Sequence, residues 1–108
     1  MPERQDQTGG AVKERADTKK QEPTLYQVVL LNDDYTTMNF VIEVLEDVFQ
    51  KTPAEAYQIM MHVHVKGRGV AGVYIWEVAE TKADKVASLA RDAGFPLRAT
   101  VRSEEHTS

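Results

Sequence analysis

The stretch VVLLNDDYTTMNF, residues 28–40, runs from a block of apolar residues through a polar turn into a helical pattern. Four successive large apolar residues, Val28 to Leu31, are typical of a strand that is buried on both faces. A turn from a strand into a helix needs one side chain to cap the helix, and Asp33, Asp34 and Thr36 are all suited to do so. At least two of these three polar side chains are therefore available for a different task.

The pattern around this turn predicts the first half of the fold. Residues 25–31 form the expected strand, and apolar residues at steps of three and four after the turn predict a helix. The stretch TPAE at 52–55 predicts the start of a second helix, because it supplies a threonine cap, a proline at the first helical position and the glutamate of a capping box. Gly67 is the expected end of that second helix.

The second half of the chain predicts a strand, a helix and a strand. Residues 72–76 are rich in β-branched and aromatic residues, residues 77–93 are helical by composition and end at Gly94, and residues 97–102 alternate apolar and polar. The order is β-α-α-β-α-β, so we expect an α+β domain with three helices packed on a small, mainly antiparallel sheet. The expected stripe of the last helix comprises Val78, Lys82, Val86, Leu89, Ala90 and Ala93.

Composition and charge exclude several classes of function. The chain has 108 residues, a formal net charge of −4 and no cysteine, which fits one domain without disulfides or a cysteine-bound metal. It has no basic cluster for a nucleic acid and no run of about 18 apolar residues for a membrane span, so we expect a cytoplasmic protein. Residues 1–24 carry ten charged residues and no aromatic residue, which predicts a disordered extension before a folded domain at 25–102 and a short tail at 103–108.

Two local motifs are interpreted as structural. The sequence GRGVAG at 67–72 fits G-x-G-x-x-G, but it follows a helix and precedes a strand, whereas a dinucleotide-binding loop follows a strand and opens a helix. We interpret it as a flexible connection after the helix stop. His62 and His64 are two positions apart on the second helix, so they point to different sides and cannot hold one ion.

The polar turn and His64 admit three hypotheses. Asp33, Asp34 and His64 are suited to zinc or a hard cation, and hence to a small metal-dependent hydrolase. Alternatively, the domain is a docking module in which the turn has no binding task. A third hypothesis uses the whole cluster, because the free α-amino group of a peptide is a cation with three donors, and Asn32, Asp33 and His64 supply acceptors and negative charge. Apolar residues that could wall a pocket beside them, or equally form ordinary core, are Met38, Val41, Met60, Val63 and Leu97.

Several segments together resemble one known family. VVLLNDDYTTMNFV at 28–41 resembles the strand-and-turn signature of the ClpS adaptors, and the "M..VH" pattern of that family matches Met60, Val63 and His64. Residues 67–74 are similar to its glycine-containing link, EVAETK at 77–82 matches a further segment, and Pro96-Leu97 matches its late "PL". The resemblance covers about residues 25–102, nearly the whole predicted domain.

The resemblance implies an adaptor without enzymatic activity, cofactor or metal. ClpS adaptors bind N-degron proteins, whose first residue is Leu, Phe, Tyr or Trp, and deliver them to the unfoldase ClpA, which feeds the protease ClpP. By resemblance, Asn32, Asp33 and His64 bind the α-amino group directly or through water, while Asp34 and Thr36 shape the turn and contact the peptide backbone. The side-chain pocket would comprise Met38, Val41, Met60, Val63 and Leu97.

The same resemblance assigns roles outside the pocket. Met38 corresponds to a gate residue whose bulk disfavours β-branched first residues. Glu77 and Lys82 would face the N-terminal domain of the unfoldase, and residues 1–24 would act in substrate hand-over. Two positions depart from the family pattern, because Thr37 replaces a usual proline and His62 replaces a small or apolar residue. Thr37 would either loosen the start of the following helix or cap it.

Overall fold

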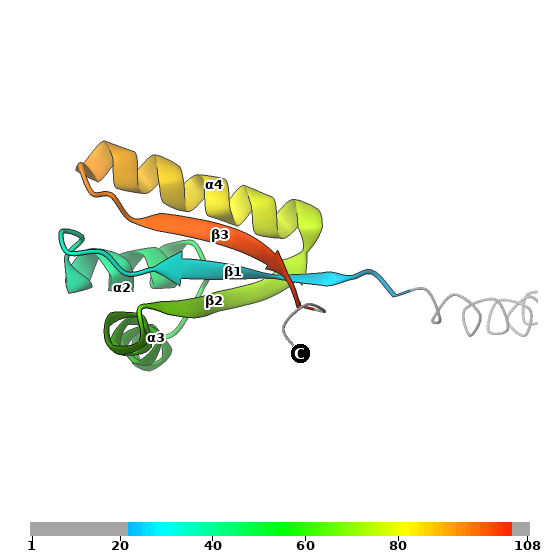
Figure 1. Cartoon of the computed structure of the whole chain (residues 1–108), viewed down its shortest axis with the longest axis horizontal. Helices are drawn as coiled ribbons and strands as arrows, with labels where there is room; N and C mark the ends of the chain where they lie inside the picture. Colours follow the sequence, from blue (N-terminus) through cyan, green and yellow to red (C-terminus); the bar gives the residue numbers. More distant parts are fainter. Residues whose placement is uncertain (1–21, 105–108) are drawn as a thin grey trace, which may run out of the picture.

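The computed structural model describes residues 22–104, so most of the predicted extension at 1–24 and of the tail at 103–108 lies outside the described residues. The elements follow the predicted order and form the predicted α+β domain (Figure 1). They are β1 (Leu25–Leu31), α2 (Met38–Asp47), α3 (Pro53–Lys66), β2 (Arg68–Ile75), α4 (Trp76–Ala93) and β3 (Arg98–Ser103).

The sheet is antiparallel, and β1 is its central strand in the order β2-β1-β3. The pairing of β1 with β2 runs from Leu25 opposite Ile75 to Leu31 opposite Arg68, with a bulge at Val28/Val29. Val28, Val29 and Leu30 are all buried, as predicted for the middle of this strand, although only Val28 and Leu30 belong to the core formed with the helices. In contrast, Leu25 is 42% exposed at the start of the strand.

The core lies on one face of the sheet, where Val28 and Leu30 meet apolar residues of all three helices. In Figure 1, α4 runs beside β3 and α3 lies near the start of β2. The predicted stripe on α4 was partly wrong, because Val78 is exposed whereas Ala79, Val86 and Ala90 are the buried residues. At the start of α4 the residue that faces the core is therefore Ala79 and not Val78. The small alanines let the helix lie close to the sheet.

The ends of α3 confirm the predicted start and stop signals. The Thr52 hydroxyl oxygen accepts from the Glu55 backbone N–H at 3.2 Å, and the Glu55 carboxylate accepts from the Thr52 backbone N–H at 3.0 Å. At the other end, Gly67 has φ 93°, a left-handed conformation that favours glycine. The structure also places Gly94 at the end of α4, as predicted.

The interpretation of residues 67–72 as a flexible connection was wrong, because β2 begins at Arg68. Gly67 provides the left-handed end of α3, whereas Gly69 serves close packing. A Cβ atom on Gly69 would lie 2.9 Å from Cγ2 of Val63, so the absence of a side chain lets β2 approach α3. Trp76, predicted as the last residue of this strand, is the first residue of α4.

No helix within residues 22–104 has the length and apolar character that a bilayer span requires.

Candidate functional site

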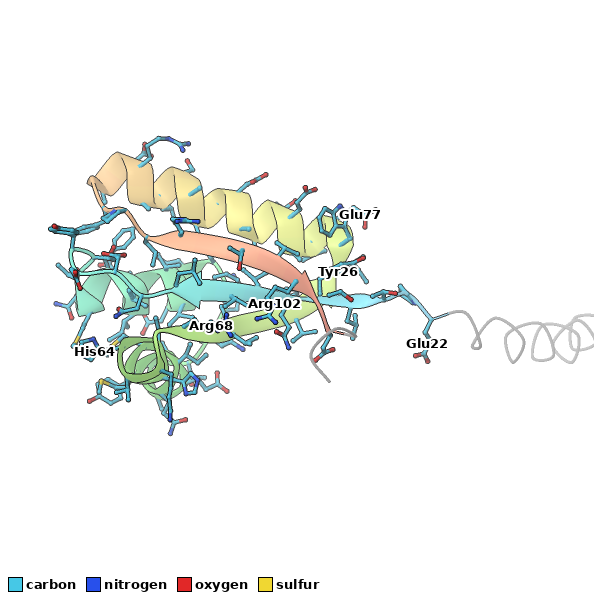
Figure 2. All side chains as sticks on the ribbon, in the orientation of Figure 1. Glu22, Tyr26, His64, Arg68, Glu77 and Arg102 are labelled. Carbon is cyan, nitrogen blue, oxygen red and sulfur yellow. The ribbon has the colours of Figure 1, made fainter. Side chains whose placement is uncertain are left out.

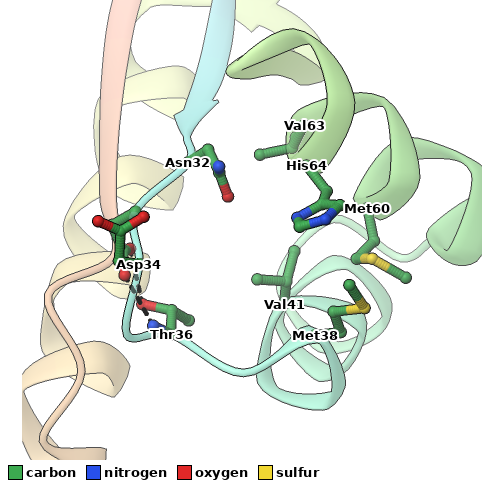
Figure 3. A pocket seen from close by; sticks show the side chains of 9 residues that line it. Asn32, Asp34, Thr36, Met38, Val41, Met60, Val63 and His64 are labelled. Atoms are coloured by element: carbon green, nitrogen blue, oxygen red, sulfur yellow. Dashed lines mark hydrogen bonds between the residues drawn. The ribbon is translucent and has the colours of Figure 1, made fainter.

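A pocket of about 220 Å³ lies where β1 ends, between the following turn, α2 and α3 (Figure 3). It brings together nine residues, all of which belong to the set predicted from the sequence. These are Asn32, Asp33, Asp34, Thr36, Met38, Val41, Met60, Val63 and His64. The sequence therefore identified segments that meet in space although about thirty positions separate them.

Asp33 organises the turn that forms one wall of the pocket. Its Oδ1 accepts from the backbone N–H groups of Tyr35 at 2.8 Å and Thr36 at 2.7 Å, and its Oδ2 accepts from the Thr36 hydroxyl at 2.7 Å. Partial burial raises the pKa of the Asp33 carboxyl group, but the three hydrogen bonds together lower it by more. The pKa therefore lies below its ordinary value of 3.8. A carboxylate has about four acceptor positions, so Oδ2 keeps the capacity for one more donor.

The turn is also tied to the far end of α3. The backbone N–H of Asn32 donates to the carbonyl oxygen of Gly67 at 2.9 Å. This bond joins the residue after β1 to the residue between α3 and β2. It holds the backbone of Asn32 beside the last turn of α3, where Val63 and His64 lie.

Thr37 caps α2, which corrects the expectation that Asp33, Asp34 or Thr36 does so. The hydroxyl oxygen of Thr37 accepts from the Phe40 backbone N–H at 3.1 Å. Thr37, which replaces the usual proline of the family pattern, is thus the N-cap residue of this helix. As a result, Asp34 and Thr36 are not used for capping and line the pocket instead.

The opposite wall of the pocket is apolar. Val41, Met60 and Val63 are buried, whereas Met38 is 44% exposed at the first position of α2. In Figure 3 Met38 and Val41 lie on the α2 side, and Met60 and Val63 on the α3 side. Leu97, predicted with this group, is a buried core residue and is not among the residues that line the pocket.

The polar rim carries acceptor groups that the protein itself leaves unused. Within residues 22–104, the side chains of Asn32, Asp34 and His64 make no hydrogen bond. His64 and Asn32 face the same hollow from opposite sides in Figure 3, and His62 is not part of it. The site therefore presents acceptors and carboxylates next to an apolar recess, which suits a small cation attached to a bulky apolar group.

The geometry does not support the metal hypothesis. Among residues 22–104, no group of three or more histidine, aspartate or glutamate side chains is arranged to hold a metal ion. In the proposed set, the Asp33 carboxylate is committed to Tyr35 and Thr36.

Glu77 and Lys82 lie on α4, away from the pocket. Glu77 is exposed in the first turn of the helix. The Lys82 ammonium donates to the Val48 carbonyl oxygen at 2.6 Å and to Gln50 Oε1 at 3.1 Å. It also lies over the Tyr74 ring at 5.3 Å. Lys82 thus fastens α4 to the end of α2, a role that no local sequence signal reveals because its partners are more than thirty positions away.

Comparisons with known proteins agree on one family. Residues 21–100 match the family described as "ATP-dependent Clp protease adaptor protein ClpS". A Maricaulis maris protein described as "ATP-dependent Clp protease adapter protein ClpS" is 55% identical over 97 residues, which cover 90% of this chain and 87% of that protein. An Acetivibrio thermocellus protein of the same description is 47% identical over 93 residues, covering 86% of this chain and 94% of that protein.

A solved structure is similar as well. The structure of Agrobacterium tumefaciens ClpS2 bound to L-phenylalaninamide is 43% identical in sequence and superposes with a TM-score of 0.74. The alignment covers 77% of this chain and 100% of that chain.

Proposed function

This chain belongs to the ClpS family of Clp protease adaptors, which is not a catalytic family, and we propose that it recognises N-degron proteins and delivers them to the ClpA unfoldase of the ClpAP protease. The recognised feature is a free α-amino group on a first residue with a bulky hydrophobic side chain: Leu, Phe, Tyr or Trp. The observation that carries this proposal is the pocket itself, in which unused acceptors adjoin an apolar recess.

The ligand in the similar solved structure supports this chemistry. L-Phenylalaninamide, bound there to Agrobacterium tumefaciens ClpS2, has a free α-amino group, a benzyl side chain and an amide where a peptide chain would continue. It therefore has the chemical groups of the first residue of a protein. We infer that the same groups enter the corresponding hollow of this chain.

The amino group would be held at the polar rim. Asn32 Oδ1 and a neutral nitrogen of His64 accept hydrogen bonds from it, and the remaining acceptor position of Asp33 receives a third, directly or through water. Each charge-assisted hydrogen bond contributes roughly 1.5–3 kcal/mol. Asp34 and Thr36, on the same rim, would contact the backbone of the following residues.

The side chain of the first residue would enter the apolar recess. Burial of one large apolar side chain contributes about 1.5–3 kcal/mol, so both halves of the site are needed for tight binding. Met38, partly exposed at the mouth, would stand against a side chain that branches at Cβ. Val41, Met60 and Val63 would surround the bound side chain, and the buried Leu97 would support the pocket from the core.

Four labelled peptides test the proposal by fluorescence anisotropy. They are identical except at the amino end, which carries Leu, Phe, Val, or Leu with an acetylated amine. Free Leu and Phe should bind at least about tenfold more tightly than the other two, because Val clashes at the mouth and acetylation removes the charge and a donor. Equal binding of all four peptides, or binding of none, would contradict the proposal.

His64→Ala should weaken binding of the Leu peptide by about tenfold or more, because it removes one acceptor of the ammonium group. The anisotropy titration compares this variant with the wild type and with His64→Gln, which keeps an acceptor at the same position. Equal binding by all three proteins would argue against His64 as a direct acceptor.

Delivery is proposed to use Glu77, and its test requires a control for charge. Glu77→Lys should weaken binding to the N-terminal domain of ClpA by about tenfold, whereas Asp84→Lys, the same charge change at another exposed position of α4, should change it by less than about twofold. Isothermal titration calorimetry measures both affinities. Equal losses in the two variants would show a general charge effect and remove Glu77 from the proposed interface.

Lys82 needs separate treatment because its ammonium group also holds the fold together. Lys82→Met leaves the Val48 carbonyl oxygen and Gln50 Oε1 without this donor, so it should lower the free energy of unfolding by about 1–3 kcal/mol. Urea unfolding of Lys82→Met therefore accompanies its calorimetry. A loss of ClpA binding without a loss of stability would assign Lys82 to the interface alone.

A further inference from the structure

The sheet has a second face that no helix within residues 22–104 covers. Side chains alternate along a strand, so residues paired across strands share a face with their partners. None of the residues on this second face belongs to the core cluster formed with the helices. We call this surface the open face; it comprises Leu25, Gln27, Val29 and Leu31 of β1, Arg68, Val70, Val73 and Ile75 of β2, and Arg98, Thr100 and Arg102 of β3.

The floor of the open face is apolar. Val70, Val73 and Ile75 are each about two-fifths exposed along β2, as is Leu25 in the central strand. Val29 lies between Val70 and Thr100 and is only 2% exposed, so the exposed apolar area of this face lies along β2 and at the start of β1. Exposed apolar residues that lie next to one another in this way mark a contact surface more often than scattered ones do.

The charge of the open face is opposite to that of the whole chain. It carries Arg68, Arg98 and Arg102 and no acidic residue, although the chain has 17 acidic and 13 basic residues. Figure 2 shows Arg68 and Arg102 on the strands of the sheet. Within residues 22–104, none of the three guanidinium groups makes a hydrogen bond or an ion pair. Three unpaired cations beside an apolar floor are complementary to an acidic and apolar partner.

The dimensions of the open face favour a helix as that partner. Arg68 and Arg98 both lie opposite Leu31 on the two outer strands, which places their backbones about 10 Å apart, the diameter of a helix. From Leu31 to Leu25 the strand spans about 20 Å, the length of roughly 13 helical residues. An extended segment would find no free backbone groups on the face of a sheet, whereas a helix satisfies its own.

We propose that the open face binds an acidic amphipathic helix of a partner protein, with the apolar stripe of the helix on β1 and β2 and its flanking carboxylates on the three arginines. The amino-terminal segment of this chain lacks the matching charge, because residues 1–21 contain five basic and four acidic residues. This site is distinct from the pocket and does not depend on recognition of an α-amino group.

Two labelled synthetic helices test this surface by fluorescence anisotropy. One has leucines at positions i, i+3, i+4 and i+7 flanked by glutamates, and the other has lysine in place of each glutamate. Both are acetylated, which removes the amine that the pocket would bind. The glutamate peptide should bind at least about tenfold more tightly than the lysine peptide, and its affinity should fall as salt screens the arginines. Equal binding of both peptides, or no binding of the glutamate peptide, would overturn the proposal.

Matched charge variants then locate the binding. Arg68→Gln combined with Arg98→Gln should weaken the glutamate peptide about fivefold or more. Lys85→Gln combined with Arg91→Gln, which removes the same charge from exposed positions of α4, should have less than about a twofold effect. Amide shifts in nitrogen-15 spectra of the wild type should concentrate on the three strands. Shifts confined to α2, α3 or the turn, or equal losses in the two double variants, would also overturn the proposal.

Discussion

Replacing Asp33 with alanine should weaken binding of a Leu-initiated peptide by about a hundredfold or more, because it removes a negative charge beside the amine and the bonds that shape the turn. Tyr35 and Thr36 together donate three hydrogen bonds to this one carboxylate. Without them the turn that follows Asn32 loses the contacts that hold its shape. Anisotropy with the Leu peptide measures the affinity, and urea unfolding should show a stability loss of about 1–3 kcal/mol.

Two milder variants separate the contributions of Asp33. Asp33→Asn keeps an acceptor for the backbone N–H groups but removes the charge, whereas Thr36→Val removes only the hydroxyl contact to Oδ2. Affinity should therefore fall most for Asp33→Ala, less for Asp33→Asn and least for Thr36→Val. If Asp33→Ala bound the peptide as tightly as wild type, neither the charge nor the turn geometry would matter for recognition.

The lowered pKa of Asp33 also gives the sign of an acid effect. Since the carboxyl group is more acidic in the folded state, its contribution to stability is present above its ordinary value of 3.8 and is lost as the pH falls through the folded value. The difference in stability between wild type and Asp33→Asn should therefore shrink in strongly acidic solution.

Leu30→Ala should lower the free energy of unfolding by about 2–5 kcal/mol, because the removed atoms leave a cavity in the middle of the central strand. Leu30 is fully buried and belongs to the core shared by the sheet and the helices. A domain of this size is typically stable by only about 5–15 kcal/mol, so the loss would unfold a visible fraction of the protein on warming.

Leu25→Ala is the matched control, since it removes the same atoms from the same strand at a position that is 42% exposed. It should cost less than about 1 kcal/mol. Urea unfolding curves of both variants give the comparison. Equal losses would mean that the start of β1 is as well packed as its middle, contrary to the burial seen in the structure.

Much of the fold was predictable because its signals are local. The capping box at Thr52 and Glu55 acts within a single turn of helix, and Gly67 ends α3 through its own backbone conformation. The three buried residues of β1 adjoin one another in the sequence and need no partner to be recognised as a strand. The order of elements followed from these signals, and the antiparallel arrangement followed from the order.

The errors arise where a distant contact decides the outcome. Arg68 to Gly72 resemble a flexible link when read alone, but pairing with β1 makes them a strand. The bonds of Lys82 to Val48 and Gln50 depend on how α4 crosses the end of α2. Similarly, four residues competed for the cap of α2, and the turn around Asp33 left that role to Thr37.

The residues that line the candidate site were predictable, but the contacts that each of them makes were not. Residue types at the turn, on α2 and on α3 identified all nine lining residues, helped by the resemblance to a family. Sequence could not show that Asp33 is mostly occupied by its own turn while Asn32 and His64 remain open. Nor could it show that Leu97 belongs to the core, since a leucine is equally suited to line a pocket or to pack in the core.

The central place of β1 has a mechanical consequence. Within residues 22–104 the strand is the first element, and it is bonded along its length to β2 on one side and to β3 on the other. A pull on the amino-terminal segment acts along β1 and perpendicular to the hydrogen bonds of both ladders, so the bonds must shear together instead of opening one by one. A force applied at the amino end of this Clp protease adaptor would therefore meet the strand that is bonded on both of its sides.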